Sequence, residues 1–231
     1  MNDSLVSHYF GEAQAAVYDD RAVLMKPVRD ALNFLIRMAL AGLRQNSRIL
    51  CVGAGTGAEL IDLALAFPNW RFTAVEPSAA MLNVCRKKAG KAGVSSRIQF
   101  HEGYLDSLPC TETFDAATSI LVSQFLTDRD QRVDFFHHIA KRLRPGACLI
   151  NADLATSLSS PEFERLVDVW LLSHRLAAGS VKASEMGWGK DVVVSAPKEV
   201  ESILTTAGFK HPILFYQCLF IHAWCTWLPR S

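Results

Sequence analysis

Three glycines within five residues constrain this chain more than any other feature. The segment Gly53-Ala54-Gly55-Thr56-Gly57 follows a short apolar run, residues 48–52, and precedes a helix-like segment, residues 58–67. A short apolar run ending in glycine is typical of a buried parallel strand. Glycines let the backbone approach a ligand, and N–H groups at a helix start favour an anion. The pattern predicts a nucleotide-binding loop, although a lone glycine cluster also forms ordinary tight turns.

Glu76 makes that prediction more specific. It ends the next predicted strand, residues 71–76, about twenty residues beyond the glycines, where a carboxylate can accept both hydroxyls of a ribose. The alternative of a helix-capping acid is weaker here, because Pro77-Ser78 already supplies a cap. We therefore expect replacement of Glu76 by alanine to weaken ligand binding and to change the stability of the unliganded protein little.

The alternation of strand and helix continues along the chain. Thr127 is the predicted cap of the helix that follows the fourth strand, and Arg144-Pro145-Gly146 ends it. The apolar tail, residues 211–228, predicts a two-stranded hairpin that turns near residues 220–222. Further helices are predicted at residues 28–43 and 78–91, and further strands at 97–102, 114–122 and 147–154. The predicted fold is α/β, a Rossmann-like doubly wound, mostly parallel seven-stranded sheet with a C-terminal antiparallel hairpin.

Length and spacing predict one domain with two added segments. A chain of 231 residues can bury one sizeable core, so we expect a single domain over residues 1–231. Residues 1–25 precede the repeat of strands and helices, and residues 155–196 are longer than a usual connection. Both segments carry aromatic and polar side chains, and we expect them to cover a substrate site.

Charge and composition exclude several partners. The 24 basic and 23 acidic residues are interspersed, which argues against a nucleic-acid partner. No apolar segment has the length of a membrane span or the form of a secretory signal, so we expect a cytoplasmic protein. We further expect a monomer or a homodimer, between which the sequence does not decide. The six cysteines are spaced as reduced thiols. A metal site at Cys218, His222 and Cys225 is disfavoured because one strand would not place all three on one face.

A nicotinamide dehydrogenase is the runner-up for the Gly53 and Glu76 pair. Gly53, Gly55 and Ala58 loosely satisfy the dinucleotide fingerprint. Gly57 makes the glycine pattern tighter, however, and the predicted hairpin replaces the second mononucleotide-binding half.

The chain resembles the class I S-adenosylmethionine-dependent methyltransferases across essentially its whole length. The motifs are Val52 to Gly57, Val75-Glu76-Pro77-Ser78, Leu143-Arg144-Pro145-Gly146 and Ala207-Gly208-Phe209. The resemblance implies S-adenosylmethionine as cofactor, Met81 near the adenine, Gly103 to Leu105 in the adenine pocket, and Leu121 to Gln124 near the methionine moiety. The implied cofactor-binding residues are Tyr18, Gly53, Ala54, Gly55, Thr56, Gly57, Glu76, Pro77, Met81, Gly103, Tyr104, Leu105, Leu121 and Gln124.

Two details qualify the resemblance. Many relatives carry an aspartate where this chain has Tyr104, and Asp106 follows two residues later. A narrower similarity to carboxy-S-adenosylmethionine synthases is seen in Gln124-Phe125-Leu126 and in Gly208-Phe209-Lys210-His211. The cofactor loop differs from that group's. Tyr18 resembles a cofactor-touching lid tyrosine, while a helix docked by its aromatic residues is the alternative for this segment.

The predicted reaction is in-line methyl transfer to a small-molecule acceptor. Positioning and exclusion of water can supply most of the acceleration, and a base is needed only if the acceptor must lose a proton. No Pro-Pro-aromatic segment of the nucleic-acid enzymes follows the fourth strand. A non-catalytic cofactor-binding regulatory subunit stays open as a further alternative. Candidate bases are His8, Asp153, His174 and His222.

Overall fold

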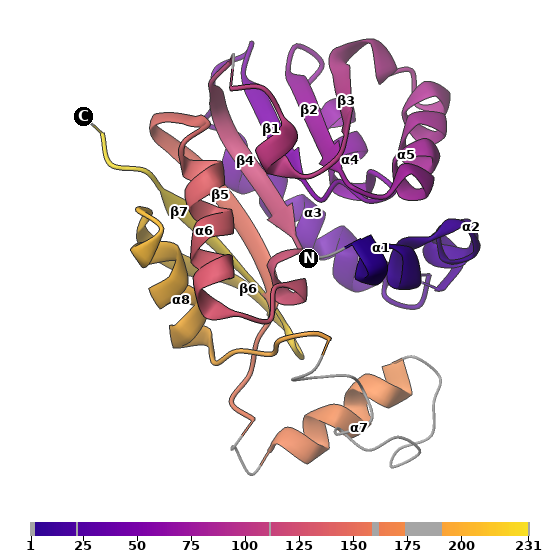
Figure 1. The fold of residues 1–231 in the computed structure, drawn as a ribbon, viewed down its shortest axis with the longest axis vertical. Helices are drawn as coiled ribbons and strands as arrows, with labels where there is room; N and C mark the ends of the chain where they lie inside the picture. Colours follow the sequence, from indigo (N-terminus) through magenta and orange to yellow (C-terminus); the bar gives the residue numbers. More distant parts are fainter. Residues whose placement is uncertain (1–2, 22, 111, 159–161, 174–190, 231) are drawn as a thin grey trace.

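The chain folds around one seven-stranded sheet in the computed structural model (Figure 1). The structure describes residues 3–21, 23–110, 112–158, 162–173 and 191–230. The strands are β1 Arg48–Val52, β2 Arg71–Glu76, β3 Ile98–Glu102, β4 Phe114–Ile120, β5 Leu143–Leu154, β6 Lys210–Cys218 and β7 Ile221–Trp227. The helices are α1 Asp3–Phe10, α2 Glu12–Arg21, α3 Lys26–Leu40, α4 Ala58–Ala66, α5 Ala79–Lys91, α6 Arg129–Ala140, α7 Phe163–Ser173 and α8 Pro197–Thr206.

The strand order β3-β2-β1-β4-β5-β7-β6 confirms the predicted fold class. Strands β1 to β5 run parallel, and β7 is antiparallel to both of its neighbours, β5 and β6. The order reverses between β1 and β4, so a crevice forms at the carboxyl ends of these strands. This topology places the glycine segment after β1 at the centre of that crevice.

Apolar side chains bury both faces of the sheet. Helices α3, α4 and α5 cover one face, where Ile36, Leu60 and Leu82 pack against β1 and β2. Helices α6 and α8 cover the other face through Phe136 and Ile203. The two helical layers are visible on either side of the strands in Figure 1. Burial on both faces explains why β1 and β2 are continuous apolar runs in the sequence.

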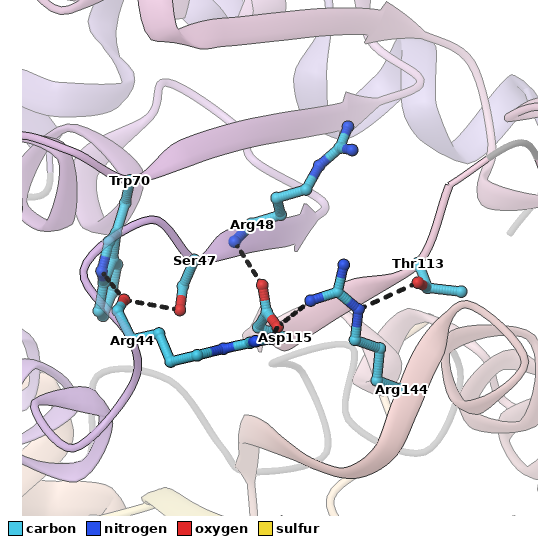
Figure 2. A network of polar contacts seen from close by, with 7 residues as sticks. All are labelled: Arg44, Ser47, Arg48, Trp70, Thr113, Asp115 and Arg144. Carbon is cyan, nitrogen blue, oxygen red and sulfur yellow. Dashed lines mark hydrogen bonds and ion pairs between the residues drawn. The ribbon is translucent and has the colours of Figure 1, made fainter.

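A buried carboxylate fastens the amino ends of the parallel strands (Figure 2). One oxygen of Asp115 accepts the Arg48 backbone N–H at 2.9 Å, and the other accepts an Arg44 guanidinium N–H at 2.8 Å. Arg144 also donates to Asp115 and to Thr113. One side chain of β4 therefore ties together the starts of β1, β4 and β5, on the edge opposite the crevice.

Several predicted boundaries are wrong. The helix predicted at residues 28–43 is Lys26–Leu40, and the strand predicted at residues 114–122 ends at Ile120. Helix α6 is capped by Asp128, which accepts the Gln131 N–H, and not by Thr127. Strand β5 begins at Leu143, because Leu143 pairs with Phe114 across an irregular register that accommodates Pro145 and Gly146. The hairpin turns at residues 219–220, where Leu219 has a φ of 52°. The turn therefore separates Cys218, which ends β6, from His222 and Cys225, which both lie on β7.

Helix α7 belongs to neither helical layer and lies apart from the sheet in Figure 1. Its buried residues Val167 and Leu171 pack with Leu154 and Ile221 at the end of the β5–β7 pair. Trp170 contacts Phe220 in the hairpin turn, with 5.6 Å between ring centroids. Residues 174–190, which contain the centre of the predicted cover, lie outside the described residues.

Candidate functional site

A cavity of about 400 Å³ lies at the carboxyl ends of β1, β2 and β4. Its walls come from the glycine segment, the ends of β2 and β3, the β4–α6 connection, helix α6, and the first two helices. Such a volume is in the range of small-molecule and cofactor sites. The cavity thus occupies the crevice that the strand order predicts.

The glycine segment has a backbone that only glycine adopts easily. Gly53, Gly55 and Gly57 have φ values of 68°, 54° and 82°. A Cβ at Gly53 would lie 2.4 Å from Val122, and one at Gly57 would lie 2.5 Å from Cys85. A Cβ at Gly55 has more room, 3.7 Å from Met81. The glycines therefore permit close packing of the β4–α6 connection and of α5 on the loop.

Four of the five backbone N–H groups of this segment donate within the protein, which corrects the expectation that they are free to face a ligand anion. Gly53 and Ala54 donate to the Val75 carbonyl, and Gly57 donates to the Ala54 carbonyl. Gly55 donates to the Glu76 carboxylate at 2.8 Å. The loop forms part of the cavity wall with its backbone, and the negative charge in this wall comes from a carboxylate side chain.

Glu76 is that side chain. Its second oxygen accepts the Ser78 N–H at 2.9 Å, so both carboxylate oxygens are held by backbone donors. The side chain lines the cavity while the residue is only 6% exposed. Burial raises the pKa of Glu76, and the Ser78 and Gly55 N–H groups oppose that shift. The carboxylate is fixed in direction and retains lone pairs for ligand hydroxyls.

Helices α1 and α2 lie over one side of the cavity, to which they contribute Phe10 and Tyr18. Asp19 accepts hydrogen bonds at 2.9 Å from Thr56 of the glycine segment and from Lys88 of α5. Although burial raises the pKa of Asp19, these two partners lower it below its ordinary value. The second helix is thus fastened to the glycine segment by charge and hydrogen bonds.

Helix α1 bridges the two sides of the crevice. The Ser78 hydroxyl donates to the Phe10 carbonyl at 2.6 Å, and the Tyr9 hydroxyl donates to Asp191 at 2.9 Å. Phe10 also contacts Phe125 edge to face, with 5.2 Å between ring centroids. The segment that the sequence predicts as a lid therefore contacts both the β2 end and the segment that leads into α8.

Most of the predicted cofactor-binding residues meet at this cavity. Those that line it are Tyr18, Gly53, Gly55, Glu76, Pro77, Met81, Gly103, Tyr104, Leu105 and Leu121. Ala54, Thr56 and Gly57 lie behind the lining and hold the loop. Gln124 is buried, and its side chain accepts the Leu154 N–H at 3.2 Å. Their ligand contacts stay predictions.

The candidate bases do not line the cavity where the structure describes them. His8 is exposed on α1 and contacts Tyr9. Asp153 is buried and paired with Arg132. His222 is buried on β7, stacked on Trp224, and burial lowers its pKa. His174 lies outside the described residues. A role for any of them as a base stays a prediction.

Helix α6 contributes lining residues that sequence reasoning missed. Gln131, Asp134, Phe135 and His138 lie along one side of this helix and line the cavity, as Asp106 does. Their spacing of three and four residues could have indicated a shared face. No sequence pattern within α6 indicated that this face of the helix lies against the crevice. Two of the missed residues, Asp134 and His138, are titratable groups within the cavity wall.

Neither a metal site nor a membrane span is found in the described part of the chain. No group of three His, Cys, Asp or Glu side chains there is arranged to hold a metal ion. None of the described helices has the length and apolar character needed to cross a bilayer.

Comparison with known families decides the assignment. Residues 49–146 match the methyltransferase domain family model, and this range holds the glycine segment, Glu76 and the β4–α6 wall. This match over about two fifths of the chain agrees with the resemblance to the class I S-adenosylmethionine-dependent methyltransferases that the sequence predicts. The predicted family and the predicted cofactor, S-adenosylmethionine, are both confirmed. The narrower similarity to carboxy-S-adenosylmethionine synthases stays a hypothesis.

Named relatives differ in their acceptors. A release factor glutamine methyltransferase of Chlorobaculum tepidum is 35% identical over 46% of this chain and 37% of its own length. A malonyl-acyl-carrier protein O-methyltransferase of Bacillus anthracis is 30% identical over 61% of this chain and 50% of its own. The chain thus spans half or less of the length of each of these two relatives.

A solved structure shows the same fold over most of the chain. An O-methyltransferase family protein from Burkholderia thailandensis superposes with a TM-score of 0.69 at 13% identity. The alignment covers 94% of this chain and 60% of that protein.

The cavity of this methyltransferase fits its cofactor. Glu76 presents two fixed carboxylate oxygens where a ribose would lie, and Gly53 and Gly55 line the same cavity without a side chain. Tyr104 and Met81 line the cavity with surfaces suited to a flat base.

Proposed function

We propose that this methyltransferase transfers the cofactor's methyl group to a small-molecule acceptor. The observation that carries the proposal is the partly covered cavity: Phe10 and Tyr18, from two N-terminal helices, line it together with the glycine segment and Glu76. A covered pocket suits an acceptor that can be enclosed, whereas a nucleic acid or large protein surface needs an open site. The near-neutral charge of the chain, +1, agrees with an acceptor that is not a polyanion.

The sheet order supports one orientation of the cofactor. Glu76 on β2 is the central anchor and takes the ribose hydroxyls. The adenine then extends toward the β3 side, where Tyr104 offers an aromatic surface for stacking. The methionine arm extends past Gly53 toward Leu121 and Val122 at the end of β4.

Catalysis in this proposal depends mainly on positioning. When bound, S-adenosylmethionine supplies an electrophilic methyl carbon with a neutral thioether leaving group. Glu76 and the β4–α6 wall fix the cofactor in direction, and the aromatic side chains of Phe10 and Phe125 exclude water. An acceptor that is already deprotonated needs no base from the protein.

The acceptors named for two relatives suggest which fractions the test should compare. The malonyl-acyl-carrier protein enzyme methylates an oxygen, and the release factor enzyme methylates a glutamine of a protein. We would incubate the protein with methyl-labelled cofactor and either a filtered metabolite extract or a desalted protein extract. Label in the small-molecule fraction is the expected result, and a Glu76→Ala protein should transfer far less. Label only in the protein fraction would contradict the proposal, and so would binding of NADH in place of S-adenosylmethionine.

A further inference from the structure

The β4–α6 connection forms one wall of the cavity in a conformation that needs support. Leu121, Val122, Phe125 and Leu126 line the cavity. Leu121 has a φ of 59°, which is unfavourable for a side chain larger than glycine. Such residues persist only where their surroundings hold them, and they concentrate at ligand sites. The wall therefore depends on contacts from behind.

A buried ion pair lies behind this wall. Arg132 of α6 donates to Asp153 of β5 at 2.9 Å, with side chains that are 2% and 0% exposed. The same guanidinium nitrogen of Arg132 donates to the Ser123 hydroxyl at 3.2 Å, and that hydroxyl donates to Asp153 at 2.6 Å. Ser123 lies between two wall residues, Val122 and Leu126. Arg132 and Asp153 thus hold the wall through one hydroxyl.

The same arginine reaches the segment before α8. Its other terminal nitrogen donates to Ser195 at 2.9 Å. The adjoining Gln124 carbonyl accepts the Val193 N–H at 2.8 Å, and the Gln124 side chain accepts the Leu154 N–H. These contacts join the wall to β5 and to residues 191–196. None of Arg132, Asp153 and Ser195 is among the residues that line the cavity.

This buried polar network stabilises the core less than well-packed apolar side chains could. Within the described residues, Nε of Arg132 and Oδ1 of Asp153 have no hydrogen-bond partner, and neither has Oδ1 of Asn151, whose side-chain amide donates to Asp153 at 3.0 Å. Buried polar atoms without partners are unfavourable, and apolar side chains often replace a buried ion pair without loss of stability. What the arginine provides is a planar set of donors that reaches three elements at once.

We propose that Arg132 is a positioning residue that, through Ser123 and Asp153, holds the β4–α6 wall against the methionine arm of the cofactor. The proposal rests on the proposed orientation of the cofactor. It predicts a selective defect: ligands that carry the methionine arm lose affinity when Arg132 is removed, whereas adenosine does not. A general loss of packing would weaken both ligands.

Arg142 offers a matched control in the same protein. It is 4% exposed, and it donates to the carbonyls of Leu105 and Leu108 on the other side of the cavity, at 2.7 and 2.9 Å. Its Nε also lacks a partner among the described residues. Because Leu105 lines the adenine side, Arg142→Met is expected to weaken adenosine and S-adenosylhomocysteine alike.

The test compares the two ligands by calorimetry in the wild type, Arg132→Met, Ser123→Ala and Arg142→Met. Arg132→Met should bind S-adenosylhomocysteine about tenfold more weakly and adenosine within about twofold of the wild type. Ser123→Ala removes a single hydroxyl, keeps the ion pair, and should show the same selectivity. It therefore tests the proposal even if Arg132→Met does not fold. Unchanged affinity for S-adenosylhomocysteine in both folded variants, or equal loss of both ligands, would overturn the proposal.

Hydrogen exchange separates this inference from the proposed function. Measured without ligand, the amides of residues 121–126 should exchange faster in Arg132→Met, and those of residues 105–108 should not. Wild-type protein that binds neither ligand would contradict the proposed function, while unchanged exchange at residues 121–126 would contradict the role of Arg132.

Discussion

Replacement of Glu76 should separate a structural role from a ligand-binding role. Its two carboxylate oxygens accept the Gly55 and Ser78 N–H groups at 2.8 and 2.9 Å. Sequence reasoning expects the unliganded protein to tolerate Glu76→Ala. The structure changes that expectation, because the variant leaves two backbone donors of the cavity wall without an acceptor.

The expected magnitudes follow from these bonds. A hydrogen bond to a charged group contributes about 1.5 to 3 kcal/mol, and water entering the cavity would replace part of it. Because burial of the carboxylate, which raises its pKa, offsets part of this contribution, Glu76→Ala should lower the free energy of unfolding by about 1 to 3 kcal/mol. Glu76→Gln, which keeps one acceptor oxygen and removes the buried charge, should lower it by less. Loss of the ribose acceptor should weaken cofactor binding by about 1 to 3 kcal/mol, or roughly 5- to 150-fold.

Urea unfolding and calorimetric titration with S-adenosylhomocysteine measure the two effects. Glu102 is the matched control, because it pairs with Glu76 in the β2–β3 register but is exposed. Glu102→Gln should leave both quantities nearly unchanged. Wild-type affinity in a folded Glu76→Ala protein would remove Glu76 from the site, and wild-type stability would show that its backbone bonds contribute little.

Three further predictions concern other charged groups. Burial raises the pKa of Glu59 from 4.5 to about 7, so the folded state binds the proton more tightly and stability should fall as the pH rises through 7. Glu59→Gln should therefore be more stable than wild type at pH 8, by up to roughly 3 kcal/mol, and equal to it below pH 4 in urea unfolding. Asp115 has a lowered pKa because Arg48, Arg44 and Arg144 outweigh its burial, so its stabilisation is present at neutral pH and is lost on acidification. Asp115→Asn should be less stable by about 1 to 3 kcal/mol at pH 7, and equal stability there would contradict this reading. Asp19→Ala removes the link from α2 to Thr56 and Lys88, and limited proteolysis should then cleave residues 3–21 faster; an unchanged cleavage rate would show that α2 is held by its apolar contacts.

The central strands and the glycine segment could be read from the sequence because their signals are local. Residues 48–52 and 71–76 were predicted with the boundaries that β1 and β2 have, since both are apolar runs with sharp polar or glycine ends. The cap of α6 was wrong because Thr127 and Asp128 are both good caps in adjacent positions. The hairpin turn was displaced because Leu219 takes the turn conformation without a glycine or asparagine to mark it.

The site was only partly predictable for a related reason. Gly53, Glu76 and Leu121 follow strand ends, and the order of the sheet brings strand ends together. Asp134 and His138 reach the cavity only because of the way α6 packs on the sheet, which is a long-range property. Asp153 was chosen as a candidate base for its chemistry at a strand end, but its partner Arg132 on α6 could not be read from spacing.

The position of β7 has a consequence for how this protein is made. Strand β7 is synthesised after every other strand of the sheet, yet it lies between β5 and β6 and pairs with both. While a ribosome is still adding residues 221–227, β5 has an open edge and β6 has no neighbour with which to pair. Completion of the sheet therefore waits for the last strand, a non-local step of the kind that slows folding and exposes strand edges to aggregation. A chain that stops after Cys218 is expected to lose cooperative unfolding, although it retains the whole cofactor cavity in its sequence.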